Sequence, residues 1–323
     1  MNVTRIPGKT YQFNNPEHAY QYAEYIIKQR EIGPLFLHYL GLTKLPPIPE
    51  GVTILFCNTN HLTTLDNLPS TLTTLFCDHN LLTEITNLPS SLKRLNCDFN
   101  IISTISNLPP TLEYLECSDN KLTYLPPLPE TLQCLNCSYN ELYRLPPFPP
   151  LLTQLICAGC KLSMLPPLPT YLRYLCCAYN YLTFLPTLPP HLDDIECQCN
   201  ELIRIPPIPD SVTRMNACHN QLMEYPLVIH IAKQDVHIFV DNNPLKEHVL
   251  DDESITIDNN IQVDMANVYM RHCNAVTKLY EIEQSQLRAQ ARCAAIKEQL
   301  MINRWHPSRV LYLLEAGYEI DDM

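Results

Sequence analysis

Apolar residues recur along this 323-residue chain with a period of 20 residues. Inside each period a short stretch alternates: Leu75 and Cys77 share one parity, and Thr74 and Phe76 share the other. Such period-2 alternation is typical of a short strand with one face turned inward. We therefore expect Leu75 and Cys77 to be buried, Thr74 and Phe76 to point outward, and successive strands to pair in parallel.

Cysteine, asparagine and proline keep the same period. The cysteines are Cys57, Cys77, Cys97, Cys117, Cys137, Cys157, Cys177 and Cys197. Asparagine follows three residues later and continues to Asn220, with Cys160 in the one exceptional place. An asparagine side chain can bond backbone groups where the chain turns out of the strand. Proline fixes φ at about −65° and lacks an N–H, so the Leu-Pro-Pro-Leu-Pro segments predict an extended, polyproline-like return.

One complete unit, LPETLQCLNCSYNELYRLPP, contains the skeleton L-x-x-L-x-C-x-x-N-x-L. On this skeleton the chain resembles leucine-rich repeat proteins, specifically the LPX subtype of bacterial effector proteins. The C-terminal HPSRVLYLLEAGYEIDD is similar to the helical tails of leucine-rich repeat proteins from giant viruses. The resemblance implies a right-handed leucine-rich repeat solenoid, with short parallel β-strands on the concave face and an extended, polyproline-like convex face.

Four regions are expected along the chain, because a solenoid needs its ends covered. Asn15 and Pro16 predict the start of a helix, and Gly33 predicts its end. We expect the C-terminal helices either to cap the solenoid or to dock a second partner. The regions are residues 1–34, an N-terminal helical cap; 35–246, the repeats with a longer last unit; 247–262, an acidic junction; and 263–323, an α-helical C-terminal region.

Composition and charge narrow the classes of function. The chain holds 15 cysteines and has no signal-peptide-like start, which favours a reducing compartment: the cytoplasm, or a host cytoplasm or virion if the protein is viral. No apolar run approaches the roughly 18 residues of a membrane span. The formal charge of −12 disfavours nucleic acid as the main partner.

The cysteine positions predict packing, because cysteine is a small apolar side chain that fits the inner position of a tight turn. Neither Cys134/Cys137 nor Cys157/Cys160 has a second pair of ligands placed to complete a metal site. We therefore expect no metal and no cofactor.

Some LPX effectors contain a ubiquitin-ligase domain with a catalytic Cys-x-Asp. Cys117-Ser118-Asp119 has that spacing but lies inside a repeat, and the tail residues Cys273 and Cys293 have no aspartate two residues later. We therefore expect no enzymatic activity, and an enzyme domain in the tail is the least favoured alternative.

The outward strand and turn positions vary between units, which indicates a surface that recognises another protein. Exposed aromatic side chains flanked by charges are typical of binding hot spots. We expect a protein partner of basic or mixed charge on the concave face; the alternative is a substrate-recognition adaptor for a ubiquitin ligase. The expected binding residues are Phe56, Phe76, Arg94, Phe99, Glu113, Tyr114, Glu116, Asp119, Tyr139, Tyr174, Tyr179, Asp193, Asp194, Glu196, Arg214 and His219.

Overall fold

The computed structural model describes residues 15–29, 33–66, 68–224, 226 and 237–245, together with the backbone of two short paired strands, β1 (Val3–Thr4) and β2 (Gln12–Phe13). The chain divides into two units, Met1–His248 and Val249–Met323, and all of the described residues belong to the first. The predictions for residues 247–262 and 263–323 lie outside the described residues, as do Cys273 and Cys293.

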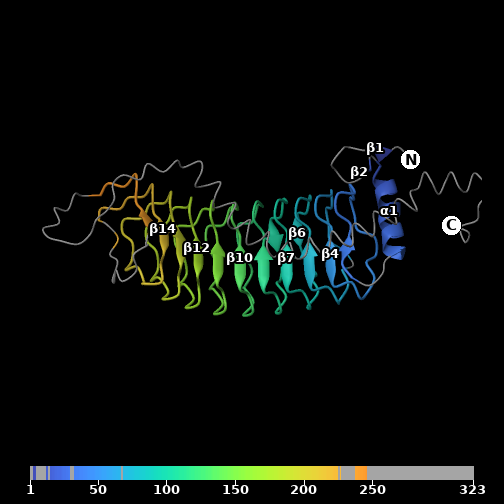
Figure 1. The fold of residues 1–323 in the computed structure, drawn as a ribbon. Coiled ribbons are helices and arrows are strands. Elements are labelled where there is room, and N and C mark those ends of the chain that lie inside the picture. The colour runs from blue at the N-terminus through green and yellow to red at the C-terminus, as the bar shows by residue number, and fades with distance from the viewer. Residues whose placement is uncertain are drawn as a thin grey trace, which may run out of the picture. The chain divides into compact units, whose positions relative to one another are not determined.

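The first unit is a parallel β-solenoid, as the period predicts (Figure 1). Its main sheet has 11 strands within the described residues, and the strands follow one another in chain order. Equivalent residues of successive units pair with one another: Leu135 pairs with Leu115 on one side and Leu155 on the other. The strands are β3 (Leu35–Phe36), β4 (Ile54–Phe56), β5 (Thr74–Phe76), β7 (Arg94–Asn96), β9 (Tyr114–Glu116), β10 (Cys134–Asn136), β11 (Gln154–Ile156), β12 (Tyr174–Cys176), β13 (Asp194–Glu196), β14 (Arg214–Asn216) and β15 (His237–Phe239).

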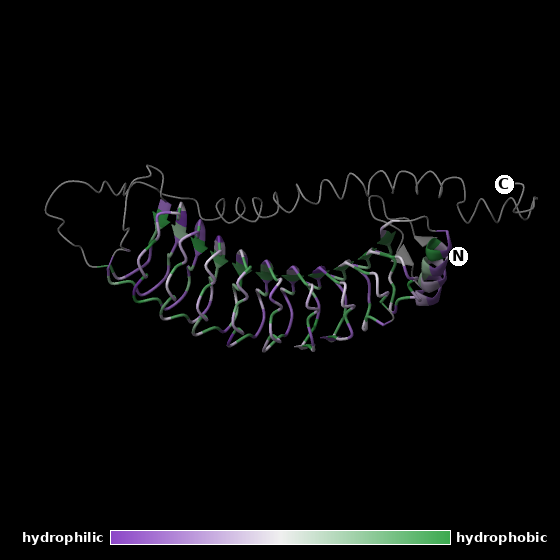
Figure 2. Ribbon diagram, turned by 90° about the horizontal axis from the view of Figure 1, so that it is seen from below, coloured by the Kyte–Doolittle hydropathy of each residue, from purple (hydrophilic) through white to green (hydrophobic). Residues whose placement is uncertain are grey.

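The turns of this unit follow a curve, and the strands line its inner side (Figure 2). The interior is filled by the inward positions of the repeat, where Leu75 and Cys77 are both 0% exposed. A buried leucine or isoleucine contributes about 1.5–3 kcal/mol relative to exposure. Because each unit shares this core with its neighbours, the repeats are stable only when stacked.

The asparagine position joins successive turns, as expected. The Asn60 side chain accepts hydrogen bonds from the backbone N–H groups of Leu40 and Leu42, both at 3.0 Å. It donates to the carbonyl oxygens of Leu37 at 2.8 Å and Cys57 at 2.9 Å. With the N–H of Gly41, which also donates to it, one amide thus satisfies five buried backbone groups at the point where the chain leaves the strand, which a hydroxyl or a thiol cannot do.

One feature differs from the expected polyproline-like return. A second small sheet pairs β6 (Glu84–Ile85) with β8 (Thr104–Ile105), and its position is marked by β6 in Figure 1. In these two units Thr86 and Ser106 stand where most other units have proline, and the unit before them has Asp66 there. The backbone N–H of Ser106 is therefore free to donate to the Ile85 carbonyl oxygen, at 3.0 Å, and the return becomes a strand.

The helix α1 (Pro16–Lys28) forms at the N-terminal side of the repeats. The Asn15 side chain accepts from the backbone N–H of Glu17 at 2.9 Å, which is an N-cap bond. Ala19 and Ala23 are 0% exposed and belong to the same apolar cluster as the repeats. The helix ends before the position predicted from Gly33. Its capping role stays a prediction, which the buried alanines support.

Candidate functional site

The face of the main sheet that is turned away from the core carries the first and third residues of each strand, because the middle residue points into the core. In β9, Leu115 is 0% exposed, whereas Tyr114 and Glu116 are partly exposed. We define the concave face as these outward strand residues together with the turn residues that follow each strand. Its composition changes along the solenoid, so its parts are described in order.

Aromatic rings form a stack at the N-terminal end of the concave face. Phe36 and Phe56 stack with ring centroids 4.9 Å apart, and Phe56 and Phe76 stack at 4.8 Å. In-register parallel strands place equivalent side chains about 4.8 Å apart, so flat rings cover one another. Phe76 is consequently only 4% exposed, and the exposure that the alternation predicts for it is not found. Phe56 is partly buried in the same stack.

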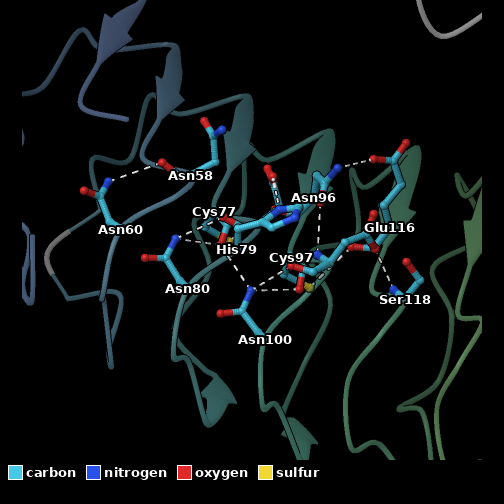
Figure 3. Close-up of polar contacts among 12 residues, drawn as sticks. Asn58, Asn60, Cys77, His79, Asn80, Asn96, Cys97, Asn100, Glu116 and Ser118 are labelled. Carbon is cyan, nitrogen blue, oxygen red and sulfur yellow. Dashed lines mark hydrogen bonds and ion pairs between the residues drawn. The ribbon is translucent and has the colours of Figure 1, made fainter. Parts of the chain in front are cut away.

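Charged side chains follow this stack. The Arg94 guanidinium lies over the Tyr114 ring at 4.2 Å, a cation–π contact between neighbouring strands. The Asn96 side chain donates to Glu116, as Figure 3 shows. Burial and, after it, the negative charge of Asp98 raise the pKa of Glu116 to about 7, while Arg94 opposes the shift. Glu116 thus titrates near neutral pH.

Asp98 is a feature of this face that is missing from the expected binding residues. It accepts from the backbone N–H of Ser118 at 2.6 Å. Burial, with a smaller effect of nearby carboxylates, raises the pKa of Asp98 to about 6, while the hydrogen bond from Ser118 opposes the shift. Asp78, one turn earlier, also has a raised pKa because it is buried, and its carboxylate lies 3.0 Å from Nδ1 of His79. The sequence pattern could have identified both aspartates, because each lies two residues after an outward strand position and so points to the same side.

Exposed aromatic side chains occupy the turn that follows the strand. Phe99, Tyr139 and Tyr179 are 49%, 47% and 48% exposed, respectively. Their φ angles are +50°, +52° and +56°, the left-handed region that favours glycine. Asp119 and His219 occupy the same turn position, with φ of +52° and +55°. A side chain in this conformation costs about 1–2 kcal/mol, so the fold alone would prefer glycine here.

An apolar patch lies between two of these aromatic turns. Ala158, Cys176 and Ala178 are buried in a cluster separate from the main core, and Ile156 and Tyr174 pack against it. Burial raises the pKa of Tyr174 well above its ordinary value, so its hydroxyl stays neutral.

The first expected acidic cluster is divided between different contacts. Glu113, directly before β9, pairs with Lys93 at 2.9 Å. Glu116 contacts Asn96, and Asp119 lies on the turn beyond the strand. The charge of Glu113 is therefore compensated by its partner, whereas Asp98 and Glu116 form the acidic part of the concave face.

The second expected cluster is divided in the same way. Asp193 lies 3.5 Å from Arg173. Asp194 and Arg214 are register partners on adjacent strands, so opposite charges face one another across β13 and β14. Glu196 accepts from Sγ of Cys176 at 3.5 Å. His219 Nε2 lies 3.0 Å from the Asn242 side-chain amide. This end of the face carries both signs of charge.

The repeated thiols are placed for packing. Cys117 is 0% exposed, and burial raises its pKa well above the ordinary value. A nucleophilic cysteine needs its thiolate, so Cys117 and Asp119 do not form a catalytic pair in this fold. Within the described part of the chain, no group of three or more metal-ligating side chains is close enough to hold a metal ion. No described helix is long and apolar enough to cross a bilayer.

Comparison with known proteins was made by sequence and by structure. No protein-family model and no curated protein match the chain. Among solved structures, YopM from Yersinia enterocolitica is similar, with 35% sequence identity, a TM-score of 0.62, and coverage of 65% of this chain. This chain spans 46% of the length of that YopM structure.

Two further solved structures are similar over the repeats. The leucine-rich repeat domain of APL1B has 20% identity and a TM-score of 0.54, covering 66% of this chain and 69% of its own. The functional domain of InlJ from Listeria monocytogenes, described as including a cysteine ladder, has 25% identity and a TM-score of 0.48. It covers 67% of this chain and 55% of its own. The described part of this chain is thus a parallel β-solenoid with the same fold as the leucine-rich repeat domain of APL1B.

Proposed function

We propose that the chain binds a protein partner on the concave face and catalyses no reaction. The observation that carries the proposal is the placement of Phe99, Tyr139 and Tyr179. Each is about half exposed on a left-handed turn where glycine would cost less. Aromatic side chains dominate the energy of many protein interfaces. Half-exposed aromatic rings, presented to solvent at regular intervals on a turn whose backbone favours glycine, therefore support a binding role.

The chemistry of the partner follows from the surface around these rings. The partly buried side chains of Ile156 and Tyr174, which pack on the buried cluster, suit an apolar side chain of the partner between Tyr139 and Tyr179. Asp98 and Glu116 suit a lysine or arginine nearer the N-terminal end, because a neighbouring cation would favour their ionised forms. We expect a partner of basic or mixed charge, with its apolar contact toward the middle of the solenoid.

Replacing the turn aromatics with glycine tests this proposal. Glycine is compatible with the left-handed turn, so Phe99→Gly and Tyr179→Gly should fold at least as well as the parent. Immobilised full chain and the double variant are compared in affinity capture from the native cell, with Tyr181→Gly as a matched control. We expect the partner to be retained by the parent and by the control and lost from the double variant. Equal retention by all three would contradict the proposal.

We also propose that the chain is an effector of the LPX type that acts in a host cytoplasm, which the similarity to YopM supports. A giant-virus origin is a further proposal, and it is supported by the C-terminal resemblance alone. No feature of the described residues favours the ubiquitin-ligase adaptor over direct binding of a partner.

A further inference from the structure

The turn that leads into each strand has a repeated hydroxyl bond. In most units the third residue of this turn is serine or threonine, and its hydroxyl donates to a carbonyl oxygen of the preceding unit. Thr131, for example, donates to the carbonyl oxygens of Pro110 and Leu112, both at 2.8 Å. The residues that make this bond are Thr71, Ser91, Thr111, Thr131 and Ser211. The bond ties adjacent units together on one flank of the solenoid.

Three consecutive units lack this hydroxyl bond. The position is Leu151, then Tyr171, then His191, none of which has an aliphatic hydroxyl to donate. Leu151 is 49% exposed and Tyr171 is 57% exposed. The backbone turn itself is unchanged, since Leu152, Leu172 and Leu192 each donate to the proline three residues earlier at 3.1–3.2 Å. The fold therefore does not require these large side chains.

The three side chains form one wall of an open groove. Its volume is about 450 Å³, within the range of ligand-binding clefts. The Tyr171 and His191 rings lie parallel, at an angle of 7° and a centroid distance of 6.0 Å, which gives an ordered apolar surface. The groove is lined by Gln133, Leu151, Thr153, Tyr171, Arg173 and His191.

Charge selects what this groove can accept. Arg173 is the one lining residue with a permanent charge, and its side chain is 67% exposed. Its ion pair with Asp193 is long, at 3.5 Å, and leaves guanidinium N–H groups for another carboxylate. Arg173 thus supplies the one cationic group in the lining of the groove, on a chain whose formal charge is −12. Its lining differs in this respect from the acidic part of the concave face.

We propose that this flank groove is a second binding site, for a peptide segment of another protein in which a leucine or aromatic side chain stands next to an aspartate or glutamate. The apolar side chain packs on Leu151 and Tyr171, and the carboxylate accepts from Arg173. The proposal goes beyond binding on the concave face, because the lining residues lie before the strands and none is among the aromatic turn residues that carry the first proposal.

Labelled peptides test the site on the full chain by fluorescence anisotropy. One pool holds hexapeptides with Leu, Phe or Tyr flanked by Asp and Glu. A matched pool has Lys and Arg in place of the acids, and a third has Gly in place of the apolar residue. We expect the first pool to bind at least about ten-fold more tightly than either of the others. Equal binding of the acidic and basic pools would overturn the proposal.

A variant that restores the repeat separates binding from folding. Leu151→Thr, Tyr171→Thr and His191→Ser together return the hydroxyl bond to all three units. We expect this triple variant to melt at the same or a higher temperature and to lose binding of the first pool by about ten-fold or more. Arg173→Gln should weaken binding and reduce its salt dependence, whereas Tyr181→Thr, equally exposed elsewhere, should leave it unchanged. Unaltered binding by the triple variant would sink the proposal.

Discussion

The ring of Tyr139 occupies the space that a side chain at Gly159 would need. A Cβ built on Gly159 would lie 2.6 Å from Cδ1 of Tyr139, closer than two carbon atoms can approach. Gly159 also has a φ of +63°, at the turn position where other units have a side chain. This glycine therefore leaves room for the aromatic residue one turn earlier.

Gly159→Ala should lower the free energy of unfolding by more than the left-handed backbone alone explains. Gly51→Ala is the matched control, since Gly51 has a φ of +88° and no atom within 4 Å of a built Cβ. We expect the Gly159 variant to lose about 1 kcal/mol more than the control, measured by urea unfolding, because the Tyr139 ring must move. In a Tyr139→Ser background this difference should vanish. Its persistence there would show that the ring is not the cause.

Cys160→Asn should stabilise the solenoid. Cys160 stands where the other units have asparagine, and its Sγ lies 3.5 Å from the Cys137 carbonyl oxygen. In the preceding unit Asn140 accepts from Leu122 N at 2.9 Å and donates to the carbonyl oxygen of Cys117 at 2.9 Å. An asparagine at position 160 can make the equivalent bonds, so we expect a gain of about 1 kcal/mol in urea unfolding.

The reverse change, Asn180→Cys, should destabilise the protein by at least as much. Cys134→Ser, at a partly exposed strand position, is the control and should change the unfolding free energy by less than about 0.5 kcal/mol. A loss of stability in Cys160→Asn would mean that the thiol is needed for packing.

Stability should fall as pH rises toward neutrality. Glu116 has a pKa of about 7 and Asp98 a pKa of about 6 in the folded chain, both raised by burial. Ordinary carboxyls titrate at about 4, so the folded state holds more protons than the unfolded state between about pH 4.5 and pH 7. The stabilisation is complete below the unfolded pKa values and is lost as pH rises through the folded ones.

Glu116→Gln should flatten this slope, because glutamine can still bond Asn96 but does not ionise. We expect the parent to lose on the order of 2 kcal/mol over this range. That is less than the full shift implies, since solvent reaches part of the Glu116 side chain. Chemical unfolding at a series of pH values measures it. An identical slope in parent and variant would show that Glu116 does not titrate in this range.

The buried thiols should react only on unfolding. Cys117 and Cys157 are 0% exposed, whereas Cys199 is partly exposed. We expect a maleimide to label Cys199 in the native protein and to label Cys117 and Cys157 only in urea beyond the unfolding midpoint. Mass spectrometry of proteolytic peptides resolves each site. Native labelling of Cys117 at the rate of Cys199 would contradict the packing role.

The period of 20 was sufficient to predict the solenoid, the parallel register and the buried positions, because each depends on a repeated residue. Features that depend on differences between units were not predicted. Phe76 is buried because three neighbouring units happen to place aromatic rings at the same strand position. The pair β6 and β8 forms in two neighbouring units where Thr86 and Ser106 stand in place of the proline of most other units. A single unit shows neither effect.

The concave face shows the same limit. The parity of each strand predicts which residues point outward, and Tyr114 and Glu116 do so. Contacts between side chains of adjacent units determine what those residues offer: Lys93 compensates Glu113, whereas Asp98 raises the pKa of Glu116. Such pairings join residues about one repeat apart in the sequence, and they become apparent only when the units are placed side by side.

The asparagine bonds also determine how such a protein can change its length. Asn80 accepts from Leu62 N at 2.9 Å and donates to the carbonyl oxygens of Cys57 and Cys77, so its partners all lie in its own turn or the one before. Duplication or loss of one whole 20-residue unit would therefore preserve every bond of this kind. The number of turns is then an evolutionary variable that sets the footprint available to a ligand without redesign of the interior.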